Sequence, residues 1–326
     1  MAEARRRVRL ARRQVRALVA DTARAVRMLL RGHDLWILTA GVTFYALLAA
    51  IPSLIVAVRI TAAVAGRGRV DSLAAAMGRA LPDTQSPAPL IQSFVEHASR
   101  VRWRDVAVAV IPATVWGEGL RRGFGRITPA ADGSTKSSGL GRVDGWRSRI
   151  AVLPVLLLSP AGLLAVLGVA PTLARLLSGT ESGDIGTADV GQSVLAFYLA
   201  LNVDWIVLSV ALAYVYRALG PRRPGRRALL TGAFFTGAFI SGFAQGFVVF
   251  LWIPVDLGSP FGGFGAVGAV VAVALWMWLF TALSVLGYAI TLALDERWTA
   301  TATAPSTAGP AGRPDAGDGQ ELELRG

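Results

Sequence analysis

The residue of this chain best placed to carry chemistry is a carboxylate within an apolar stretch. Asp204 lies near the middle of residues 193–216, two positions after Asn202. A carboxylate near the middle of a lipid bilayer is costly unless it faces water or a partner. Two hypotheses follow for Asp204: it is a proton or cation site in a translocation path, or it is a structural group that lies near the outer interface or bonds in the neighbourhood of Asn202.

Uncharged polar side chains lie in the same apolar run and in the next one. Asn202 belongs to the same run as Asp204, while Ser241 and Gln245 lie in residues 228–252. Amide and hydroxyl groups in apolar helices form hydrogen bonds between helices. Asn202 and Gln245 are therefore candidates for the lining of a polar path with Asp204, and interhelical hydrogen bonds are the alternative for both.

Metal and nucleophile chemistry has few candidate groups in this sequence. The chain contains no cysteine, which excludes disulfides, thiolate nucleophiles and cysteine-ligated metals. Its two histidines, His33 and His97, have no companion Asp or Glu cluster at ligand spacing. We therefore expect no metal site, no cofactor and no enzymatic activity.

A glycine cluster at the start of the last apolar run has the composition of a phosphate-binding loop. Its members are Gly262, Gly263, Gly265 and Gly268. A dinucleotide-binding loop follows a β-strand, however, whereas these glycines open an apolar helix. The remaining interpretations are an unwound helix start that lines a substrate cavity, and a tight turn that lets two helices pack closely.

The composition of the chain explains why these residues lie in apolar surroundings. Of the 326 residues, 53% are hydrophobic and 17% are charged, and the mean hydropathy is +0.51. Such values are typical of a chain whose solvent is mostly lipid. We expect an all-α polytopic integral membrane protein, a bundle of six transmembrane helices with amphipathic helices at the interface.

Six apolar runs are candidates to cross the bilayer, which takes about 20 helical residues. The second run is the weakest, because it is short and ends near Glu118. Pro52 interrupts the first run and should kink or break the helix there, as a packing feature or as a hinge. The predicted spans are about residues 35–58, 106–120, 150–173, 193–216, 228–252 and 264–294.

The last two runs form a hairpin that is rich in small residues. Glycines recur among phenylalanines at Gly232, Gly237, Gly242 and Gly246. Glycine lets the backbone of a second helix come close, in a solvent where no hydrophobic effect drives helices together. We expect these glycines to pack inside a bundle, and small-residue helices of this kind also allow a homo-oligomer.

Three segments lie outside the predicted spans. Residues 1–34 combine ten arginines with an apolar stripe, which predicts a basic amphipathic helix on a membrane surface. Residues 59–104 contain two short amphipathic stretches on either side of a proline-rich turn. Residues 297–326 show no hydrophobic periodicity, which predicts a disordered tail.

The distribution of positive charge predicts the orientation of the chain. The net charge is +12, and arginines are concentrated before the first run and in residues 121–149 and 217–227. Because positive loops mark the cytoplasmic side, both termini should be cytoplasmic, in a bacterial inner membrane. The Arg-rich face should then meet the lipid bilayer at its anionic headgroups. Nucleic acid is not expected as a partner, because the arginines adjoin a span and lack interleaved aromatic residues.

Three stretches occur in a distinctive order and spacing. They are FYALLAAIPSLIV at residues 44–56, YVYRALGPRRPGRRALLTGAFFTGAF at residues 214–239 and FGGFGAVGAVVAVALWMWLFTALSVLGYAITLALD at residues 261–295. Together they resemble the YihY/BrkB family of bacterial inner-membrane proteins, over about residues 30–296. The resemblance implies a polytopic inner-membrane protein, in some members linked to virulence. Some members have also carried the label ribonuclease BN.

The sequence departs from that family after a late glycine. Family members commonly have an acidic residue there, whereas Gly287 is followed by Tyr288, Ala289 and Ile290. Ribonuclease activity is not expected, because a metal-dependent nuclease needs clustered acidic or histidine ligands. We expect a transporter-like protein for a small molecule, ion or lipid, or else a non-transporting envelope scaffold that binds partners.

Overall fold

The computed structural model describes residues 2–80, 87–129, 149–155, 188–253 and 259–303, and the regular structure in these ranges is entirely helical. This confirms the all-α class for the described part of the chain. The helices are α1 (Ala2–Leu30), α2 (Leu35–Val64), α3 (Arg67–Ala80), α4 (Pro87–Arg100), α5 (Trp103–Ile127), α8 (Ala188–Leu219), α9 (Arg226–Trp252), the short 3₁₀ helix η3 (Ser259–Phe261) and α10 (Gly265–Thr303).

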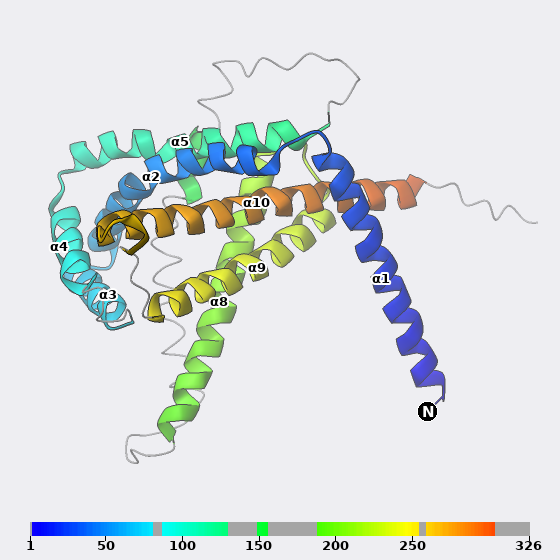
Figure 1. The fold of residues 1–326 in the computed structure, drawn as a ribbon, viewed down its shortest axis with the longest axis horizontal. Helices are drawn as coiled ribbons and strands as arrows, with labels where there is room; N and C mark the ends of the chain where they lie inside the picture. The colour runs from blue at the N-terminus through cyan, green and yellow to red at the C-terminus, as the bar shows by residue number, and fades with distance from the viewer. Residues whose placement is uncertain (1, 81–86, 130–148, 156–187, 254–258, 304–326) are drawn as a thin grey trace, which may run out of the picture.

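Helix α2 begins with a side-chain cap and runs through its internal proline. The Asp34 carboxylate accepts hydrogen bonds from the backbone N–H groups of Trp36, at 2.9 Å, and Ile37, at 3.2 Å. These bonds satisfy donors that a helix start otherwise leaves unpaired. The chain is helical on both sides of Pro52, so it does not break there, and the second half of α2 turns away from the first (Figure 1).

Helix α5 is longer than the second predicted span of residues 106–120. It ends at Ile127, so Arg121, Arg122 and Arg126, which the sequence placed in the following loop, lie in the helix. The extension is stable because Glu118 pairs with arginines three and four positions later, on the same helical face. The glycines in this part of α5 also allow it to pack closely on α2.

The later helices include the last three predicted spans. α8 and α9 cover residues 193–216 and 228–252, and α10 covers residues 265–294 and continues seven residues beyond residue 296, into the predicted tail. Of the third predicted span, residues 150–155 are described and helical. Residues 156–173 and the rest of the tail, residues 304–326, lie outside the described residues.

Figure 1 shows four helices, α2, α5, α9 and α10, running roughly side by side with alternating directions. α8 crosses α9 at a steeper angle. The C-terminal part of α1 packs on α10, and its N-terminal part extends away from the bundle. One end of the bundle therefore gathers the start of α2, the ends of α5, α8 and α10 and the start of α9. The helices α3 and α4 lie at the opposite end.

The main core lies where α5, α8 and α10 meet. Phe124, Tyr216 and Tyr288 are fully buried, with ring centroids 4.4 to 5.7 Å apart. The Tyr216 hydroxyl donates a hydrogen bond to the Ser284 carbonyl oxygen at 3.0 Å. Burying these rings removes a large apolar area from solvent, and the hydroxyl retains a partner, as a buried polar group requires.

Large apolar side chains also cover the outside of the bundle. Ile37 and Ile51 on α2, Phe239 on α9 and Val270 on α10 are all at least 60% exposed. A water-soluble protein rarely exposes so many, so these faces are suited to lipid. Among the described residues, four helical segments are long and apolar enough to cross a membrane: Leu35–Val64, Leu201–Leu219, Arg226–Phe247 and Val267–Thr301.

Candidate functional site

The Asp204 carboxylate joins α8 to α9. The Ser241 hydroxyl of α9 donates a hydrogen bond to Asp204 Oδ2 at 2.8 Å and lies 3.4 Å from the Leu201 carbonyl oxygen. Ser241 is 1% exposed, while Asp204 is half-buried. The carboxylate therefore lies at a helix contact and keeps part of its surface accessible.

The two other residues predicted for a polar path do not bond to Asp204. The Asn202 side-chain amide donates to the Tyr198 carbonyl oxygen of its own helix at 2.7 Å. Gln245 lies one helical turn beyond Ser241 on α9 and is half-buried. In the described residues, no hydrogen bond connects either amide to the carboxylate, and the group that does reach it is Ser241.

A tryptophan next to Asp204 strengthens the same helix contact. The Trp205 indole N–H donates to the Phe234 carbonyl oxygen of α9 at 2.8 Å, and the two rings lie 4.3 Å apart. One turn further along α8, Ser209 lies against Gly237 of α9. The spacing between α8 and α9 around Asp204 is therefore set by close packing on both sides of Trp205.

The predicted packing glycines of α9 differ in what they face. Gly232 lies against Thr291 of α10, and Gly237 lies against Ser209 of α8. A Cβ on Gly246 would lie 3.8 Å from Trp276, which is ordinary contact, and one on Gly242 would have no atom within 4 Å. Two of the four glycines therefore mediate close helix contacts within the chain.

The glycines before α10 form a turn. Gly262 and Gly263 have φ values of +67° and +86°, in the left-handed region that residues with a Cβ rarely adopt. Both follow η3 and precede the start of α10 at Gly265, and Gly268 is buried in the first turns of that helix. This part of the chain thus reverses direction between α9 and α10.

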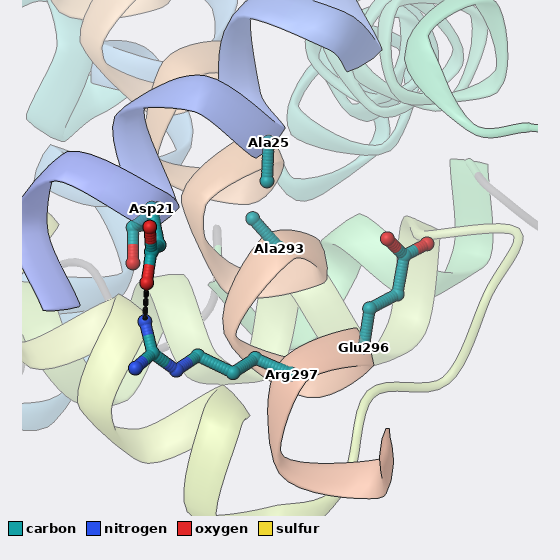
Figure 2. A pocket seen from close by; sticks show the side chains of 6 residues that line it. Asp21, Ala25, Ala293, Glu296 and Arg297 are labelled. Atoms are coloured by element: carbon teal, nitrogen blue, oxygen red, sulfur yellow. Dashed lines mark hydrogen bonds and ion pairs between the residues drawn. The ribbon is translucent and has the colours of Figure 1, made fainter. Parts of the chain in front are cut away.

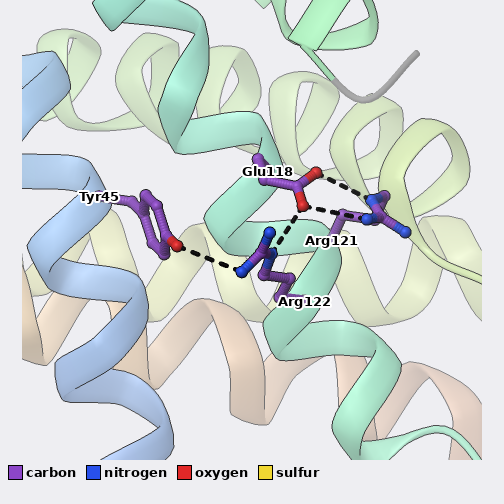
Figure 3. Close-up of polar contacts among 4 residues, drawn as sticks. All are labelled: Tyr45, Glu118, Arg121 and Arg122. Atoms are coloured by element: carbon purple, nitrogen blue, oxygen red, sulfur yellow. Dashed lines mark hydrogen bonds and ion pairs between the residues drawn. The ribbon is translucent and has the colours of Figure 1, made fainter. Parts of the chain in front are cut away.

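An ionic cluster between α2 and α5 was not predicted from the sequence (Figure 3). Glu118, whose side chain is 6% exposed, accepts hydrogen bonds from Arg121 at 3.0 and 3.1 Å and from Arg122 at 2.6 Å. The Arg122 guanidinium also lies 3.5 Å from the Tyr45 hydroxyl and 6.0 Å from the centre of its ring. The sequence signal is a glutamate followed by arginines at positions i+3 and i+4.

A pocket lies between α1 and α10 (Figure 2). Its volume is about 460 Å³, and an ion pair between Arg297 and Asp21, 3.1 Å apart, crosses one side of it. Both partners are substantially exposed, so the pair contributes little to stability. The lining residues are Asp21, Thr22, Ala25, Ala293, Glu296 and Arg297. Apolar packing of Val26 and Leu29 into the core holds α1 at this position.

The loop between α8 and α9 is held by three residues of α10. Asp295 accepts a hydrogen bond from the Gly225 backbone N–H at 2.7 Å, and Glu296 pairs with Arg222 at 2.7 Å. The Tyr288 hydroxyl donates to the Arg222 carbonyl oxygen at 3.2 Å. These contacts fix the start of α9 relative to the end of α10. In the described ranges, no group of three or more His, Asp or Glu residues has the arrangement of a metal site.

Comparison with known proteins identifies the family of the chain. The model of the family described as virulence factor BrkB matches residues 30–311, which is most of the sequence. A search of the curated proteins and a search of the solved structures found no match. The match agrees with the resemblance noted in the sequence and with the long apolar helices. The chain is therefore an integral membrane protein that belongs to the BrkB family.

Proposed function

We propose that this protein is a non-enzymatic, transporter-like protein of the bacterial inner membrane, and that Asp204 is a binding group for a proton or a small cation on its path. The observation that carries the proposal is that Asp204 is hydrogen-bonded without being paired to a positive charge among the described residues. Its described hydrogen-bond partner is a neutral hydroxyl, Ser241. The charge of the carboxylate is therefore available to a mobile cation.

The contrast with Glu118 supports this assignment. Both carboxylates lie at helix contacts, but Glu118 is bonded to two guanidinium groups. A carboxylate with a purely structural role in apolar surroundings is normally paired with a positively charged side chain, as Glu118 is. Asp204 has no ion pair in the described part of the chain, and charged groups of this kind inside membranes often mark ion or proton pathways.

The arrangement of the helices supports six spans with both termini in the cytoplasm. α5 has 25 residues and packs along α2, so at about 1.5 Å per residue it is long enough to cross the hydrocarbon core. The residues 150–173 supply the sixth span in this proposal. Most of the arginine-rich helix termini lie on the same side of the bundle, where they would face the cytoplasm and the anionic lipid headgroups of that leaflet.

The test uses purified protein reconstituted into liposomes. Three probes are used separately: protons, followed with a pH-sensitive dye in the lumen, and potassium or sodium, followed with ion-sensitive dyes. Wild-type protein should carry at least one of them, and Asp204→Asn should abolish that flux. Asp105→Asn is the matched control, because it makes the same change at an exposed carboxylate in the first turn of α5. Equal flux through the Asp204→Asn protein would remove this residue from the mechanism.

A second candidate function is a scaffold in which α9 joins copies of the chain or other membrane proteins. It is favoured by Gly242, which faces open space, beside the exposed rings of Phe239 and Phe243. In this case Gly242→Leu should dissociate an oligomer that native mass spectrometry detects in lipid nanodiscs. A wild-type protein that is monomeric in nanodiscs would contradict the scaffold and leave the flux experiment as the deciding one.

A further inference from the structure

The ionic cluster of Tyr45, Glu118, Arg121 and Arg122 carries an excess of positive charge. One carboxylate is shared by two guanidinium groups, and the described chain offers neither arginine a second carboxylate. Arg121 uses two nitrogens on Glu118 and is largely buried, with its side chain 14% exposed. The two arginines therefore share one positive charge that no carboxylate of the described residues balances.

Arg122 is also the accessible member of the cluster. Its side chain is 53% exposed, and its Nε is committed to Glu118 while Nη1 approaches the Tyr45 hydroxyl. Of its five N–H groups, three have no acceptor among the described residues. The Tyr45 hydroxyl, which accepts from Arg122, still has its own proton to donate. Two neighbouring groups that can still donate hydrogen bonds thus lie at one point between α2 and α5, and one of them, Arg122, is exposed.

The cluster lies partway along α2, beside the last part of α5. A Cβ on Gly119 would lie 2.7 Å from the Tyr45 Cβ, and one on Gly123 would lie 2.8 Å from Val42, so the cluster packs against residues 42–45. Tyr45 is ten residues after Leu35, which corresponds to about 15 Å along the helix. Arg122 itself is five residues before α5 ends at Ile127, which corresponds to about 8 Å along that helix. From there a long arginine side chain can extend toward the headgroups, and an anion within its reach lowers the cost of the unbalanced charge.

We propose that Arg122 and Tyr45 form a binding site for a phosphate group, supplied by a lipid headgroup or by free phosphate. Guanidinium groups bind phosphate with two parallel hydrogen bonds, and the hydroxyl of Tyr45 adds a third. Glu118 orients the guanidinium by accepting a hydrogen bond from its Nε (Figure 3), so the remaining N–H groups keep a fixed direction. The site is separate from Asp204, and a protein that carried no ion would still bind phosphate here.

Native mass spectrometry of the full-length protein tests this site. The protein is incubated in detergent with phosphatidylglycerol, or with diacylglycerol, which has the same acyl chains and no phosphate. Wild-type protein should retain phosphatidylglycerol selectively. Arg122→Gln should lower this retention about tenfold, the effect expected for one charge-assisted contact. The matched control is Arg126→Gln, an exposed arginine one turn later on α5.

A further variant guards against loss of folding. Arg122→Lys keeps the positive charge and the pairing with Glu118 within reach, so it should retain part of the lipid binding. Millimolar inorganic phosphate displaces the lipid if the site accepts the free ion, and leaves it bound if the headgroup is required. Equal retention by Arg122→Gln and Arg126→Gln, with both proteins folded, would overturn the proposal.

Discussion

Thr291 of α10 lies directly against Gly232 of α9, where a Cβ on the glycine would collide with the threonine side chain. The same contact occurs in reverse one turn away, because Thr236 of α9 lies against Gly287 of α10. Each threonine hydroxyl is bonded to the carbonyl oxygen four residues earlier in its own helix. The crossing of α9 and α10 is thus a reciprocal pairing of glycine and threonine.

Gly232→Ala should destabilise the protein by about 1–3 kcal/mol, the usual cost of an added group in a packed helix contact. Thermal unfolding in detergent micelles measures the effect. Gly242→Ala is the matched control on α9, because an added Cβ there meets no atom within 4 Å. If both alanine variants unfolded at the wild-type temperature, the close contact between Gly232 and Thr291 would be refuted.

Asp295→Ala should destabilise the start of α9. The N-cap residue Gly225 has no side chain, and the Asp295 carboxylate accepts a hydrogen bond from its backbone N–H and lies at the positive end of the helix dipole. The expected loss is about 1 kcal/mol, similar to that of an ordinary N-cap. Titration with SDS measures it, and Asp71→Ala, an exposed acid beyond the first turn of α3, serves as control. Equal losses for the two variants would argue against a capping role.

Arg59→Ala should loosen the contact between α2 and the start of α5. The Arg59 guanidinium donates to the Val101 carbonyl oxygen at 3.0 Å and lies 4.5 Å from the centre of the Trp103 ring. Together these contacts are worth about 1–2 kcal/mol. Hydrogen exchange of residues 101–105 should become faster, whereas Arg67→Ala, at the exposed start of α3, should leave it unchanged. Wild-type exchange in the Arg59→Ala protein would refute this contact.

Reporter fusions test the proposed orientation. A fusion after Pro224 should report the cytoplasm, because this loop carries five arginines in residues 217–227. Fusions after Gln192 and Leu257 should report the outside. The opposite pattern at all three positions would invert the protein and place the Arg-rich end outside.

The regular features of the fold were predictable, because they depend on local patterns. Apolar runs of about 20 residues identified α2, α8, α9 and α10, and the amphipathic stretches in residues 59–104 correspond to α3 and α4. The family was also predicted and is confirmed. The number of spans stays a prediction, since four are recognised by length and composition in the described residues.

The contacts between helices were not predictable, because they depend on which face of each helix packs against its neighbour in the folded chain. The sequence singled out Gly232 and Gly237, but nothing in it identifies Thr291 and Ser209 as their partners. Asp204 was recognised by its apolar surroundings, whereas its partner Ser241 lies 37 residues away on another helix. Glu118 was taken as the end of a weak span, since hydropathy counts its charge and ignores the arginines that balance it.

The three residues that hold the loop between α8 and α9 belong to the last described helix of the chain. Gly225 is 70 residues before Asp295, a stretch that a ribosome takes roughly 4–14 s to synthesise at about 5–20 residues per second. During that interval the start of α9 has none of its contacts to α10. The Arg-rich end therefore assembles only after translation has passed Glu296, and a chain truncated before Tyr288 would reach the membrane with this loop unsecured.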